Sequence, residues 1–198
     1  MALALRHLLP LAVVITKIAL VLFYKGEFYM EKTISKHATA TSVAELTKIA
    51  IIAAMYVTIT ATLAVFSFGA IQLRLSEMFN YLALYHKRYV VAVTLGVVIA
   101  NFMSPTWFLD VPIGSIATFL VLILCRAVTK NIENEIVKLA ITAVIFALSM
   151  FTVAGQLVIL YDLPFFYTWL TVGIGELLSM TVGGAFIYLL SKKMDLTK

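Results

Sequence analysis

The stretch FFYTWLTVGIGELLSMTVGGAFIYLL, from Phe165 to Leu190, contains a single Asp, Glu, Lys or Arg side chain, Glu176. A helix needs about 20 predominantly apolar residues to cross the hydrocarbon core of a bilayer. The stretch is longer than that, so it predicts a membrane-spanning helix. The rest of the chain must then be compatible with a membrane.

The composition of the whole chain is also that of a membrane protein. The 198 residues are 63% hydrophobic and 13% charged, whereas soluble chains average about 45–50% and about 25%. So few charges cannot cover a soluble globule, which excludes an ordinary cytosolic enzyme, a nucleic-acid-binding domain and a disordered regulator. The single cysteine, Cys125, excludes a disulfide framework and a multi-cysteine metal site.

Upstream of this stretch lie further apolar segments separated by polar turns. We predict helices over residues 43–68, 70–85, 89–103, 112–128, 136–161 and 165–190, the second of them short and polar. Pro105 stops the third helix and Pro112 opens the fourth, because proline lacks a backbone N–H but is tolerated in a first helical turn. The expected fold is an all-α integral membrane protein, a six-transmembrane-helix bundle over residues 43–192 with a tail over 193–198.

Residues 1–42 form an N-terminal extension. Its apolar segment, Leu3 to Tyr24, carries Arg6 and Lys17, and a charge near a helix centre costs about 2.5–3.5 kcal/mol on insertion scales. The segment also lacks the small-residue cleavage site of a secretory signal. Two interpretations stay open: an interfacial amphipathic helix, or an upstream leader with the true start at Met30.

Basic residues predict the orientation. With the sixth helix ending inside, the inner side after Met30 holds eleven Lys and Arg residues and the outer side holds Arg74 alone. The eleven are Lys32, Lys36, Lys48, Lys87, Arg88, Arg126, Lys130, Lys138, Lys192, Lys193 and Lys198. Cytoplasmic loops are enriched in Lys and Arg, so both ends of the bundle are expected in the cytoplasm of a multi-pass cell-membrane protein.

Small residues recur at four-residue spacing in three rows: Ala50, Ala54, Thr58 and Thr62; Ala92, Gly96 and Ala100; and Gly175, Ser179 and Gly183. In lipid, close backbone approach through small side chains takes the place of a hydrophobic drive between helices. Each row therefore suits packing within the bundle. An alanine row facing outward would instead suit docking of a partner membrane protein.

Several polar side chains fall inside the predicted spans. Arg74, Glu77 and Asn80 share a face of the second helix, Asn101 lies in the outer half of the third, and Glu176 lies near the midplane of the sixth. Asp110 follows in an outer loop beside Trp107. Intramembrane ionisable groups usually face a cavity or one another. We therefore predict a pocket open to the outside, with an alternative in which Arg74 and Glu77 form a satisfied ion pair without a ligand.

The excess of carboxylates over Arg74 gives this predicted pocket an acceptor character. It suits a ligand that is cationic or rich in N–H donors. The aromatic rings of Trp107, Phe108, Tyr81 and Phe166 are candidates to stack on a flat ring, although aromatics near the interface are commonly anchors.

Catalytic signatures are missing from the sequence, which has no G-x-S-x-G, H-E-x-x-H or P-loop motif. The three histidines all lie at or before predicted cytoplasmic ends, away from the outer acidic residues. We predict no enzyme activity, no cofactor and no metal. Active transport would need an energy-converting partner subunit.

Five segments together resemble the queuosine-precursor transporter family (QueT). They are AIIAA at Ala50–Ala54, IQLRLSE at Ile71–Glu77, NFMSPTWFLD at Asn101–Asp110, GSIAT at Gly114–Thr118 and GIGEL at Gly173–Leu177. The resemblance runs from about Leu46 to Lys193. Residues 1–29 are not covered by it, which supports a functional start at Met30.

The resemblance implies a substrate-binding (S) component of an energy-coupling factor (ECF) importer. Such components dock through an Ala-x-x-x-Ala surface, matched here by Ala50 and Ala54, to a shared transmembrane subunit that carries two ATP-hydrolysing subunits. Family ligands would be 7-deazaguanines such as queuine or 7-aminomethyl-7-deazaguanine. We expect Glu77 and Glu176 to accept from the ligand and Asn101 to read it. The alternatives are a component for another vitamin, such as biotin or riboflavin, and a ligand-free membrane scaffold.

The other site residues have supporting roles in this hypothesis. Asp110 is expected to be an anion of the gate loop and Arg74 to organise Glu77, with Asn80 and Trp107 completing the substrate-binding set.

Overall fold

The longest helices of the chain coincide with its most apolar stretches. The structure, a computed structural model, describes residues 40–68 and 72–197, and within these ranges it is helical and has no strand. This part holds four helical segments long and apolar enough to cross a membrane, Val43–Thr62, Trp107–Thr129, Glu135–Tyr161 and Phe165–Ser191. The all-helical class is therefore confirmed, while the count of six spans stays a prediction.

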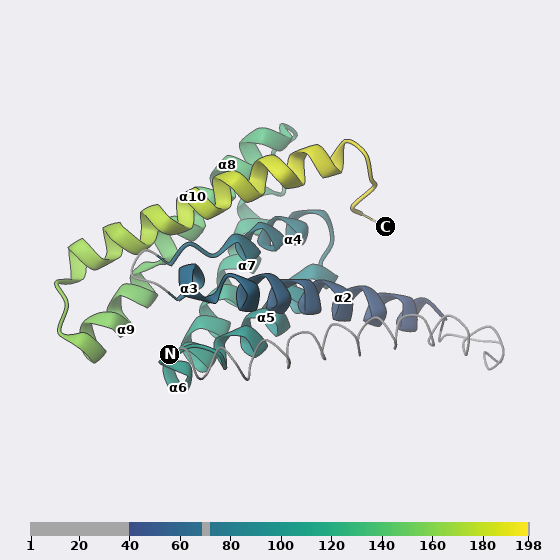
Figure 1. The fold of residues 1–198 in the computed structure, drawn as a ribbon. Helices are drawn as coiled ribbons and strands as arrows, with labels where there is room; N and C mark the ends of the chain where they lie inside the picture. The colour runs from purple at the N-terminus through teal and green to yellow at the C-terminus, as the bar shows by residue number, and fades with distance from the viewer. Residues whose placement is uncertain (1–39, 69–71, 198) are drawn as a thin grey trace.

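In chain order the elements are α2 (Ala40–Thr62), α3 (Ala64–Ser67), the 3-10 helix η1 (Leu75–Tyr81), α4 (Leu82–Tyr85), α5 (Arg88–Asn101), α6 (Trp107–Leu109), the π-helical turn η2 (Asp110–Gly114), α7 (Ser115–Thr129), α8 (Glu135–Ser149), α9 (Phe151–Tyr161) and α10 (Phe165–Ser191). Figure 1 shows α10 running along one side of the bundle, with α9 beside its first half. The predicted extension over residues 1–42 lies outside the described residues, apart from 40–42, which begin α2.

The predicted helix over residues 70–85 is wrong in form. Gln72 has a positive φ of 52°, and regular structure starts only with η1, which α4 continues for one turn. Polar side chains of this segment bond to other elements; for example, Ser76 Oγ lies 2.6 Å from Thr60 Oγ1 of α2. At a rise of about 1.5–2 Å per residue, η1 and α4 together reach only about 20 Å, which is too short to cross a bilayer core of about 30 Å.

Pro112 does not open the fourth helix. The helical segment begins at Trp107, and Pro112 lies inside η2. The wider π-helical turn accommodates a residue that cannot donate a backbone hydrogen bond. The sequence had placed Asp110 and Trp107 in an outer loop. This was wrong, because both residues are helical.

Breaks also divide two other predicted helices. The predicted helix 43–68 is interrupted at Leu63 between α2 and α3, and the helix 136–161 is interrupted at Met150 between α8 and α9. The helices predicted over 89–103 and 165–190 are confirmed as α5 and α10 to within two residues at each end.

Two of the three rows of small residues pack inside the bundle. Gly96 of α5 faces Tyr56 of α2 so closely that an added Cβ would lie 2.8 Å from the Tyr56 Cβ. Gly183 of α10 faces Met78 of η1 at a still shorter distance. The third row differs, because Ala50 is exposed and Ala54 is half-buried. This alanine row lies on an outer face of α2.

Replacing Gly183 with alanine is expected to lower the free energy of unfolding by about 1–3 kcal/mol, the usual cost of overpacking a tight contact. The new Cβ would overlap Met78 Cβ and lie 2.8 Å from Met78 Cα, so either η1 or α10 must move. Thermal denaturation of the purified protein in detergent measures the change.

Gly155→Ala provides the matched control. It lies within α9, and an added Cβ there meets no atom of the described residues within 4 Å. Alanine favours a helix over glycine, so this variant should be as stable as the parent or more so. Equal melting temperatures for the two variants would contradict the assigned contact between η1 and α10.

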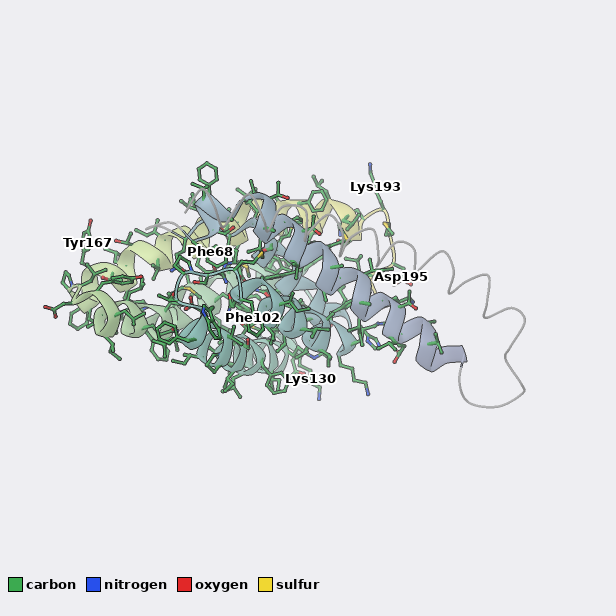
Figure 2. All side chains as sticks on the ribbon, turned by 60° about the horizontal axis from the view of Figure 1, so that its bottom comes forward. Phe68, Phe102, Lys130, Tyr167, Lys193 and Asp195 are labelled. Atoms are coloured by element: carbon green, nitrogen blue, oxygen red, sulfur yellow. The ribbon has the colours of Figure 1, made fainter. Side chains whose placement is uncertain are left out.

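Polar contacts join four helix ends at one end of the bundle. Lys192 Nζ lies 3.0 Å from Glu135 Oε2, which ties the end of α10 to the start of α8. Arg88 at the start of α5 lies 3.5 Å from Glu45 Oε1 near the start of α2, and it donates to the Thr197 carbonyl at 2.8 Å. Figure 2 shows Lys193 and Asp195 toward this end and Tyr167 at the other.

Candidate functional site

A cavity lies at the end of the bundle that carries the α9–α10 turn. Its outer part has a volume of about 630 Å³ and is lined by Phe68 just after α3, by the α5–α6 connection, by α9 and by the first turns of α10. A smaller inner part of about 50 Å³ reaches η1, α7 and Glu176 of α10. The two parts share Gln72, Arg74, Asn101, Gly114 and Val153 as lining residues, so they adjoin. Phe68 and Tyr167, labelled in Figure 2, line the outer part.

Glu77 lines the inner part and is held by three side chains. Its Oε1 accepts a hydrogen bond from the Tyr56 hydroxyl at 2.6 Å and lies 3.5 Å from Arg74 Nη1. Its Oε2 accepts from Asn80 Nδ2 at 2.5 Å. Both oxygens of Glu77 therefore already have partners within the protein, the arrangement that the ion-pair alternative expects for this residue.

Glu176 is in a different situation. It is 3% exposed, lines the inner part, and its Oε1 has no hydrogen-bond partner among the described residues. Two further buried oxygens on the cavity wall share this property within the described part of the chain, Asn101 Oδ1 of α5 and Gln156 Oε1 of α9. We call these three oxygens the acceptor set. A buried acceptor without a partner is costly, so three around one cavity indicate that something other than the protein satisfies them.

Arg74 lies between the two parts of the cavity. Its guanidinium pairs with Glu77, interacts electrostatically with Glu176, and stands over the Phe68 ring with 5.3 Å from Cζ to the ring centroid. Its backbone N–H donates to Ser179 Oγ at 3.0 Å, which attaches the start of η1 to α10. The sequence-predicted trio of Arg74, Glu77 and Glu176 is thus brought together from two segments far apart in the chain.

Asp110 and Asn101 build the wall of the outer part. The Asp110 carboxylate accepts hydrogen bonds from the hydroxyls of Ser104 and Thr106, the latter at 2.6 Å. Asn101 Nδ2 donates to the Asp110 carbonyl at 2.8 Å. An added Cβ at Gly114 would come within 2.8 Å of Asn101 Nδ2, so a larger residue there would displace the Asn101 amide. The Asn101 amide is therefore oriented by its nitrogen, and its oxygen has no hydrogen-bond partner among the described residues.

Two predicted site residues are not on the cavity wall. Asn80 is fully buried behind Glu77, where it supports that carboxylate. Trp107 is 51% exposed and stacks on Phe102 with 6.0 Å between ring centroids. Among the other aromatic candidates, Phe108 and Phe166 are exposed, and the Tyr81 hydroxyl donates to the Met180 carbonyl.

Sequence analysis missed several polar or aromatic lining residues, among them Gln156, Tyr161 and Tyr167. Gln156 is the clearest omission, since it is a polar residue in the middle of an apolar span. The rule that selected Asn101 and Glu176, a polar side chain at membrane depth, would have selected it too. The two tyrosines carry no such signal, because tyrosine is common at both membrane interfaces.

Comparisons with known proteins agree with this architecture. The family model described as QueT transporter matches residues 46–193. The "Queuosine precursor transporter QueT" of Lactococcus lactis subsp. cremoris (strain MG1363) is 38% identical over 163 residues, which cover 78% of this chain and 96% of the relative. No solved structure gives a match. With its four apolar helices, the protein is therefore a multi-pass membrane transporter and not an enzyme. The chain belongs to the QueT transporter family.

Proposed function

We propose that this protein is the substrate-capture subunit of an ECF-type importer and that it binds a queuosine precursor, a 7-deazaguanine, from outside the cell. The family match and the name of the L. lactis relative support the substrate class. The observation that carries the proposal is the acceptor set, three buried oxygens from α5, α9 and α10 around one cavity.

The chemistry of a 7-deazaguanine complements this wall. Its flat bicyclic ring offers N–H donors at the pyrimidine N1, at the 2-amino group and on the pyrrole nitrogen, and the amide oxygens of Asn101 and Gln156 can receive two of them. The ring carbonyl suits the Arg74 guanidinium. The outer cavity of about 630 Å³ lies within the range of about 300–1,000 Å³ that is usual for small-molecule sites.

The proposed roles follow the hydrogen bonds. Glu176, Asn101 and Gln156 accept from the ligand, while Asn80 donates to Glu77, Glu77 pairs with Arg74, and Asp110 stabilises the mouth. Trp107 is left out of the proposed site, because its ring stacks on Phe102 outside the cavity wall.

The partner subunits and the orientation are part of the proposal. The cavity lies at the end opposite Arg88, Lys192 and Lys193, and Lys and Arg favour the cytoplasmic side. This supports an orientation with both ends of the bundle in the cytoplasm and a cavity that receives substrate from outside. The outward alanine row at Ala50 and Ala54 supports docking to the ECF transmembrane subunit, whose two ATP-binding subunits would drive uptake.

Calorimetric titration of the purified protein tests the proposal. We expect saturable one-site binding of a 7-deazaguanine, and about tenfold weaker binding by Gln156→Leu, which removes one acceptor. Thr181→Val is the control, because the Thr181 hydroxyl bonds the Leu177 carbonyl on an exposed face of α10.

Two outcomes would overturn the proposal. One is the lack of saturable binding by any 7-deazaguanine, the result expected of a ligand-free scaffold. The other is a different vitamin co-purifying with the protein, identified by mass spectrometry after gentle detergent extraction.

A further inference from the structure

The inner part of the cavity has an unbalanced set of charges. Among the described residues its wall carries three ionisable acids or bases, Arg74, Glu77 and Glu176. With all three ionised, the inner part holds one net negative charge. Asp110, in the outer wall, is a further carboxylate and does not compensate this negative charge. The hydroxyls of Ser104 and Thr106 already donate hydrogen bonds to it.

The excess charge can be assigned to one residue. Arg74 pairs with Glu77 at 3.5 Å, and Glu77 also receives the Tyr56 hydroxyl and the Asn80 amide. Glu176 forms no ion pair with any described residue within 4.0 Å, and its Oε1 points to no protein donor in that part of the chain. A charge so deeply buried normally has an ionic partner.

We infer that Glu176 is the counter-ion for a positively charged group of the ligand and that it makes the site select a 7-deazaguanine bearing a protonated amine over neutral analogues with the same ring. This rests on the proposed function and adds the charge state of the substrate to it. An alkylamine on the ring is cationic at neutral pH, as the lysine side chain is. An ammonium group donates up to three hydrogen bonds, so it satisfies Glu176 Oε1 and neutralises the inner cavity in a single contact.

The ring-binding contacts do not provide this selection. Asn101 and Gln156 carry neutral amide oxygens, which accept from any N–H donor of the ring regardless of its substituent. A neutral substituent such as a nitrile offers no proton to Glu176. It would leave the carboxylate without a partner, and the site would bind the same ring more weakly.

Two ligands that share one ring and differ in its substituent separate the contribution of the amine from that of the ring. Calorimetry on the full-length protein should show that 7-aminomethyl-7-deazaguanine binds about 10- to 100-fold more tightly than 7-cyano-7-deazaguanine, the range of one charge-assisted hydrogen bond. Glu176→Gln should remove most of this preference. It should weaken the binding of the amine ligand and change the affinity for the nitrile ligand by no more than about threefold. Glu176→Asp, which keeps the charge, should keep the preference for the amine.

Glu135→Gln is the matched control. It makes the same chemical change at the far end of the bundle, where Glu135 pairs with Lys192, and should leave the preference unchanged. Equal affinities of the parent protein for the two ligands, or a preference that survives Glu176→Gln, would overturn the inference while leaving the proposed function intact. If neither ligand binds the parent protein, the proposed function itself fails.

Discussion

Arg74→Met is expected to lower the free energy of unfolding by about 3–5 kcal/mol, the cost of removing one partner from a buried ion pair. Arg74 is the cation on the inner cavity wall among the described residues, and its side chain is only 15% exposed. Without it, Glu77 and Glu176 face one another across a small cavity with no compensating positive charge. Methionine keeps much of the volume of the side chain, so the effect isolates the charge. Thermal denaturation in detergent, without ligand, measures it.

Two further variants sharpen this test. Lys130→Met removes a positive charge from an exposed position and should change the stability by no more than about 0.5 kcal/mol. Adding Glu77→Gln to Arg74→Met should recover part of the loss, because the amide of glutamine still offers an oxygen to Tyr56 or Asn80 and carries no charge. An Arg74→Met protein as stable as the parent would show that the carboxylates do not depend on this cation.

Much of this fold is predictable from hydropathy. The helices α5 and α10 were found almost to the residue, because each is a continuous apolar run with clear polar limits. The form of the segment around η1 was not predicted, because the spacing of its polar residues also fits a regular α-helix. Its side chains instead form hydrogen bonds to α2, as Ser76 does with Thr60. Such long-range partners cannot be predicted from the local spacing of polar and apolar residues.

The candidate site shows a similar limit. The rule that polar residues at membrane depth face a cavity selected Arg74, Glu77, Asn101 and Glu176, and all four line the inner part of the cavity. From the sequence, both glutamates were expected to accept from the ligand, with a satisfied Arg74–Glu77 ion pair as the alternative for Glu77. The difference depends on Tyr56, which is 21 residues from Glu77 and contributes a hydroxyl that no pattern would assign to it. The structure separates a carboxylate with internal partners from one that faces the cavity.

The small-residue rows illustrate why packing direction is also hard to predict. All three have the same spacing, yet the rows containing Gly96 and Gly183 face neighbouring elements, and the row containing Ala50 faces outward. In a membrane protein both the interior and the lipid-facing surface are apolar, so hydrophobicity does not reveal which face of a helix is buried.

Replacing Ala50 with tryptophan is expected to reduce cellular uptake of the 7-deazaguanine at least about tenfold, while the purified variant binds it as the parent does. Helices in lipid associate through small residues that let their backbones approach, and a large ring on α2 would hold the proposed partner away. Ala50 is exposed and far in sequence from the cavity-lining residues, so the fold and the site should be unaffected. A loss of about 1.4 kcal/mol in docking suffices for a tenfold change.

Ala127→Trp is the control for this prediction, since Ala127 is an exposed alanine on another helix, α7, and should tolerate the ring without loss of uptake. The comparison distinguishes a specific docking face from a general intolerance of bulky residues in the membrane. If Ala50→Trp transports as well as Ala127→Trp, the alanine row is not a docking face. If both binding and uptake fall in Ala50→Trp, the row contributes to the fold of the bundle, and docking must use another surface.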